Sequence, residues 1–243
     1  MTDRYHARFG RRRLVAGSAG LLAAPLLVGL PGAGPAMADA LTREQRDAMS
    51  PDDIIAVMKT GNRRFRSGER KSRDYLAEQR ASAAGQFPAA VILSCIDSRA
   101  PAEVVLDLGI GDVFNSRIAG CVADEDVIGG MEFACKLAGA KVVLVMGHTA
   151  CGAVAGAIAD ARLGNLTKLL AKIRPAVEAV QFSGERSASN PAFVDAVAKK
   201  HVELTMALIR ERSPVLQALE MQGQVKIAGA MYDLGTAAVE FIG

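Results

Sequence analysis

Two short segments of the chain carry side chains of the types that bind zinc. Residues 95–99 read Cys-Ile-Asp-Ser-Arg, and residues 148–152 read His-Thr-Ala-Cys-Gly. Zinc binds thiolate, imidazole and carboxylate groups in a tetrahedron, so Cys95, His148 and Cys151 with one further ligand would complete a shell. Three protein ligands with an open fourth position are typical of a catalytic zinc rather than a structural one.

Each of these residues also has an ordinary structural interpretation. Cys95 and Cys151 could be small buried apolar residues, and His148 could be a hydrogen-bonded core histidine. Asp97 could cap a following helix, and Arg99 could be a surface arginine. The combination of all five at the ends of two predicted strands favours the metal site over these alternatives.

The elements that must position these residues are predicted from apolar periodicity. Short continuous apolar runs, typical of strands buried on both faces, lie at 89–94, 113–116, 141–146 and 225–231. Helical patterns lie at 50–65, 74–84, 101–107, 126–137, 151–163, 166–180, 191–212 and 214–221. The alternation predicts an α/β fold: a mainly parallel central sheet of four strands plus an antiparallel edge strand at 236–242, flanked by helices. Both zinc-binding segments follow strands, at the carboxyl edge where sites form in such sheets.

The first 38 residues have the pattern of an export signal. Three consecutive arginines, Arg11 to Arg13, precede an apolar stretch from 14 to 30, and Ala36-Met37-Ala38 follows. This order resembles a twin-arginine signal, so we expect cleavage near Ala38, a domain over 39–243, and a periplasmic or secreted protein. The alternative is an uncleaved membrane anchor, for which about 17 apolar residues are marginal.

The composition indicates a globular protein that lacks the basic surface needed to bind nucleic acid. Half of the 243 residues are hydrophobic, 23% are charged, and the formal net charge is +3. Much of the basic excess lies in the predicted signal, and the basic run at 63–73 is interrupted by Glu69. We expect contact with a membrane only through the signal during export.

With these motifs in view, the chain resembles the β-class carbonic anhydrases over about residues 50–243. The resemblance rests on the two segments above and on Gly-Asn-Arg-Arg-Phe at 61–65. It implies a zinc lyase that interconverts carbon dioxide and bicarbonate, with one zinc per chain. It also implies a homodimer or a tetramer of dimers.

The resemblance further implies roles for individual residues. Cys95, His148 and Cys151 would be the metal ligands, and Asp97 and Arg99 the catalytic dyad. Three positions are expected to bind substrate, namely Gln86, Phe114 and Gly152. Gln86 and Phe114 match family positions that line the pocket, commonly across a dimer interface. Gly152 would offer a backbone N–H at the start of a helix, and a side chain at this position would crowd the metal.

The expected mechanism is attack of zinc-bound hydroxide on carbon dioxide, with Arg99 holding Asp97 off the metal. Some family members have a closed form in which the aspartate is the fourth ligand. A regulated subgroup of this kind carries a tryptophan three residues before the first cysteine ligand, where this chain has Ile92. We therefore predict an open site near neutral pH.

The chain departs from the family pattern at two positions. Cys121 stands where the family usually has asparagine and Phe133 where it commonly has tyrosine, and both affect details of the pocket.

Three other functions remain open from the sequence. A zinc-containing binding or scaffold protein would keep the metal shell without turnover. A cysteine-nucleophile enzyme would use Cys95 or Cys151 with His148 as base. A hydrolase of another small cumulated molecule, such as carbon disulfide, would use the same site.

Overall fold

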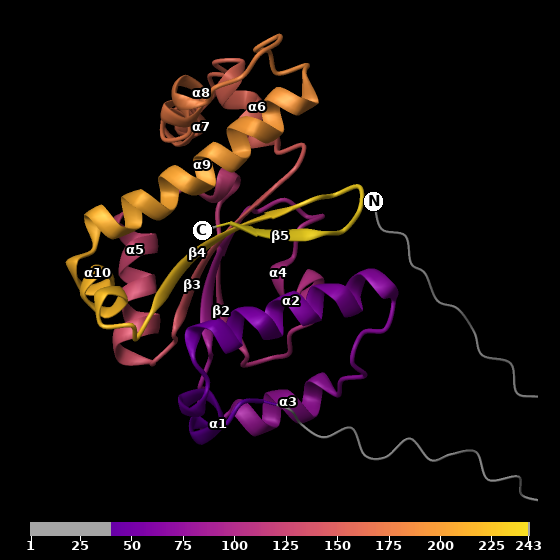
Figure 1. Cartoon of the computed structure of the whole chain (residues 1–243), viewed down its shortest axis with the longest axis vertical. Coiled ribbons are helices and arrows are strands. Elements are labelled where there is room, and N and C mark those ends of the chain that lie inside the picture. The colour runs from indigo at the N-terminus through magenta and orange to yellow at the C-terminus, as the bar shows by residue number, and fades with distance from the viewer. Residues whose placement is uncertain (1–39, 243) are drawn as a thin grey trace, which may run out of the picture. The chain divides into compact units, whose positions relative to one another are not determined.

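A five-stranded sheet lies at the centre of residues 40–242, the part of the chain that this computed structural model describes (Figure 1). The strands are β1 (Ala90–Ser94), β2 (Val113–Arg117), β3 (Val142–His148), β4 (Lys226–Tyr232) and β5 (Val239–Ile242). Their order is β2-β1-β3-β4-β5, and only β5 runs antiparallel to its neighbour. The predicted fold class is confirmed. The predicted export signal lies outside the described residues.

The two central strands, β1 and β3, are buried along their whole length, as their continuous apolar sequences predict. Successive strand side chains point to opposite faces, so each strand supplies two separate buried clusters. One cluster includes Val91, Leu93, Val143 and Val145. The other includes Ala90, Ile92, Val142 and Leu144. The sheet therefore has a core on each face, as a parallel sheet requires.

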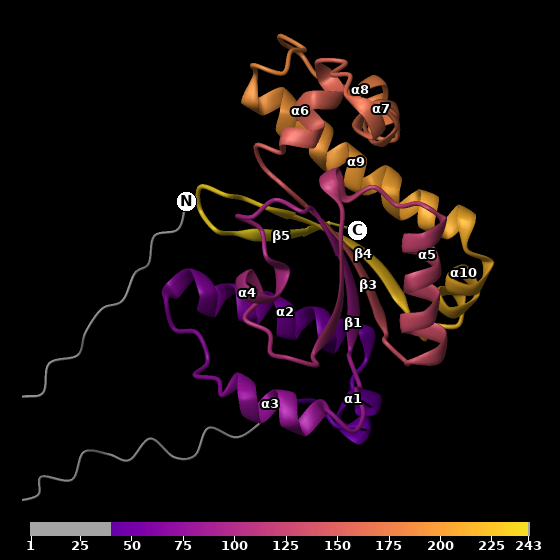
Figure 2. The ribbon, with the colours of Figure 1, turned by 180° about the vertical axis from the view of Figure 1, so that it is seen from behind.

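Helices cover both faces of the sheet (Figures 1 and 2). Before β3 the chain forms α1 (Arg43–Ala48), α2 (Pro51–Ser67), α3 (Tyr75–Ser82), α4 (Ala102–Val105), η1 (Ala119–Cys121), α5 (Glu125–Glu132) and η2 (Phe133–Leu137). After β3 it forms α6 (Gly152–Ile158), α7 (Gly164–Ala171), α8 (Arg174–Ala179), α9 (Pro191–Arg212) and α10 (Pro214–Met221). Residues of α2 and α4 belong to the second cluster, and residues of α5, α9 and α10 to the first.

Four helical segments differ from the sequence prediction by more than two residues. The predicted helix at 151–163 ends at Ile158, the last residue of α6. The predicted helix at 166–180 is two helices, because Pro175 lacks an N–H and fits only in the first turn of a new helix, α8. The predicted helix at 126–137 ends as a π-helical turn, η2. Helix α1 was not predicted, although Thr42 and Gln45 form a capping box at its start.

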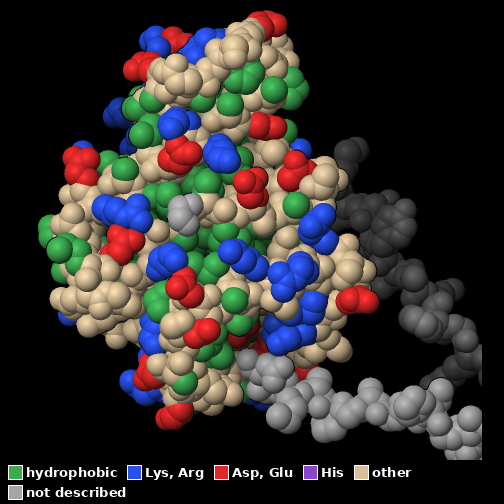
Figure 3. Space-filling view, in the orientation of Figure 1, with side chains coloured by type: hydrophobic (Ala, Val, Ile, Leu, Met, Phe, Trp, Pro, Cys, Tyr) green, Lys and Arg blue, Asp and Glu red, His purple; other side chains and the backbone are tan. Residues whose placement is uncertain are grey.

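The surface carries charges of both signs. Basic and acidic side chains are interspersed on the face shown in Figure 3. Surface ion pairs include Arg162 with Asp160 at 2.9 Å and Lys172 with Asp124 at 3.1 Å. Within residues 40–242 no helix combines the length and the apolar character needed to cross a bilayer.

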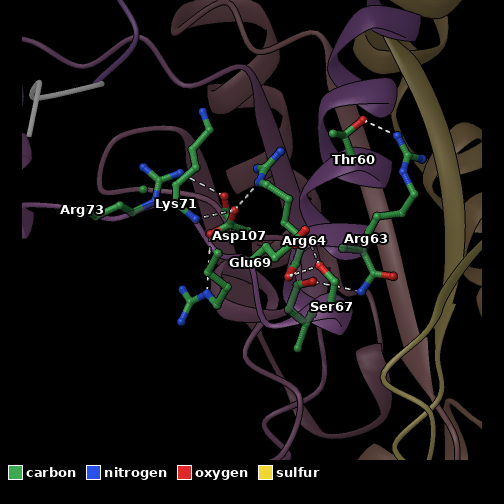
Figure 4. Close-up of polar contacts among 12 residues, drawn as sticks. Thr60, Arg63, Arg64, Ser67, Glu69, Lys71, Arg73 and Asp107 are labelled. Carbon is green, nitrogen blue, oxygen red and sulfur yellow. Dashed lines mark hydrogen bonds and ion pairs between the residues drawn. The ribbon is translucent and has the colours of Figure 1, made fainter. Parts of the chain in front are cut away.

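A buried carboxylate, Asp107, joins the end of α2 to the segment before β2 (Figure 4). Its side chain is 0% exposed and accepts a hydrogen bond from Arg64 Nε at 2.6 Å. The backbone N–H of Lys71 donates to the same oxygen at 3.2 Å, and Arg70 Nε lies 3.5 Å from the other oxygen. These contacts fix the chain that leads into β2.

Asp107→Asn is expected to lower the free energy of unfolding by about 2 to 3 kcal/mol, because it removes the charge that compensates partly buried arginines. Asp160→Asn is the matched control: Asp160 also lies at a φ of 50° and contacts two arginines, but it is exposed. Its loss should cost less than about 1 kcal/mol. Urea unfolding at fixed protein concentration measures both, and equal costs would contradict the structural role of Asp107.

Candidate metal centre

Cys95, His148 and Cys151 meet at the carboxyl edge of the sheet. Cys95 directly follows β1, His148 is the last residue of β3, and Cys151 is the N-cap of α6. Because β1 and β3 are adjacent and parallel, their carboxyl ends lie side by side. The three ligand atoms all lie within 4.8 Å of one another, and all three residues are buried. The structure thus brings together the three residues that the sequence singled out.

The ring of His148 is oriented for metal binding. Its Nδ1 lies 2.9 Å from the carbonyl oxygen of Thr149, and its Nε2 is buried without a hydrogen-bond partner among the described residues. A histidine that ligates a metal typically donates its other N–H to a carbonyl or carboxylate, which fixes the tautomer. With two thiols beside the free Nε2, the donor set fits a zinc ion.

The two sulfur atoms influence each other electrostatically. The hydrogen bond from Cys151 lowers the pKa of Cys95, and the same contact raises the pKa of Cys151. The backbone N–H of Gly120 also donates to Cys95 Sγ at 3.3 Å. A thiolate at Cys95 is therefore favoured over one at Cys151, and a bound cation would deprotonate both thiols.

Asp97 and Arg99 form a bidentate ion pair beside this cluster. Arg99 Nε donates to Asp97 Oδ1 at 3.0 Å, and Arg99 Nη2 donates to Asp97 Oδ2 at 2.8 Å. These bonds hold the pKa of Asp97 well below its usual range. Asp97 Oδ2 lies 3.9 Å from His148 Nε2, so the carboxylate is next to the metal ligands while its oxygens are directed to Arg99.

Arg117 is a site residue that the sequence reasoning missed. It ends β2, and its guanidinium donates to the carbonyl oxygens of Cys95 at 3.0 Å and of Asp97 at 2.6 Å. It thereby fastens the backbone that presents both side chains. Arg117 directly follows a predicted strand and so lies at the same edge of the sheet as the ligands. This position could have indicated its role from the sequence.

Of the three predicted substrate-binding residues, Gln86 and Phe114 lie away from the cluster within one chain. Gln86 is exposed and precedes β1, so it lies at the opposite end of that strand from Cys95. Phe114 pairs with Val91 near the start of β1 and packs edge-on against Phe133, with ring centroids 6.1 Å apart. Within one chain, Gln86 does not come to the metal ligands.

Gly152 lies at the start of α6, next to Cys151, and is exposed. A Cβ built on Gly152 would have no protein atom within 4 Å. Apart from the residues next to it in the chain, no protein atom therefore requires a glycine at this position. Crowding of a bound metal by a side chain here stays a prediction.

The remaining cysteines and histidine of the described chain do not join the cluster. Cys121 and Cys135 are buried free thiols, and Cys121 Sγ donates to the carbonyl oxygen of Met146 at 3.0 Å. His201 is 6% exposed on α9, and burial lowers its pKa to about 4. It lines a pocket of about 820 Å³ between α5 and α9.

Comparisons with known proteins agree on one family. Residues 90–239 match the family described as carbonic anhydrase. Carbonic anhydrase 2 of Mycobacterium tuberculosis is 37% identical over 182 residues, which cover 73% of this chain and 86% of that protein.

Solved structures of β-carbonic anhydrases share the fold. The Coccomyxa enzyme in complex with acetazolamide is 25% identical with a TM-score of 0.60, covering 66% of this chain and 74% of that one. A tetrameric enzyme of Sordaria macrospora has a TM-score of 0.60 at 24% identity, covering 70% of this chain and 90% of that one.

Proposed function

Because this chain belongs to the β-carbonic anhydrase family and is a carbonic anhydrase, we propose that Cys95, His148 and Cys151 hold a zinc ion at which carbon dioxide is hydrated. The observation that carries this proposal is the close approach of the three donor atoms, within 4.8 Å, with His148 Nε2 buried and unpartnered among the described residues. A zinc ion held there would acidify a bound water and supply the hydroxide that attacks carbon dioxide.

Asp97 orients the attacking group and Arg99 orients Asp97. Asp97 remains ionised near neutral pH because Arg99 lowers its pKa, so its oxygens act only as hydrogen-bond acceptors. Both oxygens are engaged by Arg99, and this arrangement supports an open fourth metal position. Arg117 keeps the backbone of this segment in place.

The substrate pocket is completed by a second copy of the chain. Gln86 and Phe114, the expected amide donor and apolar wall, lie away from the cluster of their own chain. Phe114 lies on β2, an edge strand whose backbone can meet another chain. Phe133, which packs against Phe114, is 51% exposed, and the neighbouring Leu137 is 76% exposed. This apolar edge suits a subunit interface.

The protein is accordingly expected to be a dimer or a tetramer of dimers. Cyclic dimers are the commonest oligomers, and a two-fold interface at β2 would bring each Gln86 towards the partner's metal site. Sedimentation velocity at the assay concentration measures the assembly. A fully active monomer would contradict the proposed pocket.

Stopped-flow hydration of carbon dioxide tests the function. The zinc-loaded chain should catalyse the reaction, chelation should abolish it, and zinc should restore it. Metal analysis also separates two of the rival functions, the zinc scaffold and the cysteine-nucleophile enzyme. One zinc per chain with turnover excludes a scaffold role, whereas activity that survives zinc removal would favour a cysteine nucleophile.

We also propose that residues 1–38 direct export and that residues 39–243 form the mature enzyme. The support is the arrangement of Arg11 to Arg13, the apolar stretch and Ala36-Met37-Ala38. Intact-mass analysis of protein recovered from the periplasm should find a chain beginning near Asp39. A full-length chain confined to the cytoplasm would contradict the proposal.

A further inference from the structure

The loop between β3 and α6 contains a backbone conformation that its sequence does not favour. Ala150 lies between His148 and Cys151 and has a φ of 52°, in the left-handed region. An alanine there is strained, because its Cβ comes close to the following carbonyl. Such conformations persist only when surrounding contacts impose them, and they occur often at functional sites.

Two side chains hold Ala150, one at each of its backbone polar groups. The Ala150 N–H donates to Asp195 Oδ1 at 2.8 Å. Arg99 Nη2, which also binds Asp97, donates to the Ala150 carbonyl oxygen over a longer distance of 3.5 Å. A chain of contacts therefore runs from Asp195 through Ala150 to Arg99 and Asp97.

Asp195 lies on a helix that is fixed firmly against the sheet. On α9, Val194, Val197 and Ala198 are buried in the core next to β3. A Cβ on Gly147, the residue before His148, would lie 2.7 Å from Val202 of α9, so the glycine permits the close approach of helix and strand. This packing puts Asp195 beside the loop that follows His148.

The contact with Ala150 is the principal interaction of Asp195. Among residues 40–242 no lysine or arginine forms an ion pair with Asp195, and the one hydrogen bond of its side chain is the one from Ala150. A hydrogen bond from a backbone N–H to a carboxylate is stronger than one to a neutral acceptor. The Asp195 carboxylate can therefore hold the backbone N–H of Ala150 in its strained conformation.

We infer that Asp195 is a positioning residue for the metal centre. Through Ala150 it fixes the segment that carries His148 and Cys151, and it supports the arginine that holds Asp97. This inference rests on the proposed function and adds a residue outside both sequence motifs. Asp195 acts on the geometry of the ligands and does not contact substrate.

Asp195→Ala should lower kcat about tenfold with little change in KM. A tenfold loss is at the lower end of the range for substitutions of residues that support metal ligands. The cobalt-substituted variant should show altered visible absorption bands, because the ligand geometry is less fixed. Asp195→Asn keeps an acceptor oxygen and should stay within about threefold of the wild type. Asp195→Glu keeps the charge but misplaces the oxygen, and should resemble Asp195→Ala.

Lys199→Ala is the matched control, because it removes a salt bridge to Glu240 from the same helix, one turn further on. It should leave kcat and the cobalt spectrum unchanged.

Wild-type kcat and an unaltered cobalt spectrum in Asp195→Ala would overturn the inference, as would activity lost only in proportion to unfolded protein. If Asp195→Ala does not fold, Asp195→Glu decides. An inactive wild type would refute the proposed function, while the cobalt spectra would still test the role of Asp195.

Discussion

Substituting His148 with alanine is expected to remove both zinc and carbon dioxide hydration. His148 supplies the buried Nε2 that has no protein partner among the described residues, and the two thiols alone would leave the metal with half its shell. The loss of activity should exceed the roughly 100-fold that the largest outer-shell changes cause. Metal analysis after dialysis and stopped-flow hydration measure the two losses, and Cys95→Ser and Cys151→Ser should behave alike.

His201→Gln is the control for His148→Ala. His201 is the other histidine of the described chain, and it is buried on α9 outside the metal cluster. This variant should keep one zinc per chain even if its thermal stability falls. Retention of stoichiometric zinc by His148→Ala would show that the ligand assignment is wrong.

Asp97→Asn should separate metal binding from turnover. The variant should retain zinc, since Asp97 lies outside the cluster of three donor atoms. It should lose about 10²- to 10⁴-fold in kcat, the range for a side chain that handles the reacting proton, because an amide replaces the ionised acceptor. Stability should change by less than about 1 kcal/mol, since the Arg99 side chain is 57% exposed.

Asp160→Asn provides the same chemical change at an exposed aspartate that also contacts arginine. Its kcat should equal that of the wild type. Normal turnover by Asp97→Asn would refute the role assigned to the dyad, whereas loss of zinc from it would indicate that Asp97 is itself a ligand.

The sequence predicted the elements that carry strong local signals. Helices α9 and α10 begin and end at the predicted residues, because Asn190 and Ser213 cap them and Pro191 and Pro214 follow the caps. The metal ligands were predictable for a related reason. They lie at or just beyond the ends of two apolar strands, and parallel strands end at one edge of the sheet.

Contacts between distant segments could not be predicted in this way. Asp195 reaches Ala150 from 45 residues away, and Asp107 binds Arg64 from 43 residues away. Neither pairing leaves a periodic pattern in the sequence, since each depends on how a helix packs on the sheet. The position of Gln86 away from its own metal ligands likewise follows from the direction of β1 rather than from a motif.

A crystal structure of the zinc-loaded protein at about pH 7.5, just above the pKa of about 7 expected for a good zinc-bound water, tests the central claim most directly. The account predicts zinc bound by Cys95 Sγ, His148 Nε2 and Cys151 Sγ, a water as fourth ligand, and Asp97 still paired with Arg99. An Asp97 oxygen within about 2.2 Å of zinc, the bonding distance for a carboxylate, would contradict the open site. Zinc bound elsewhere in the chain would contradict the account as a whole.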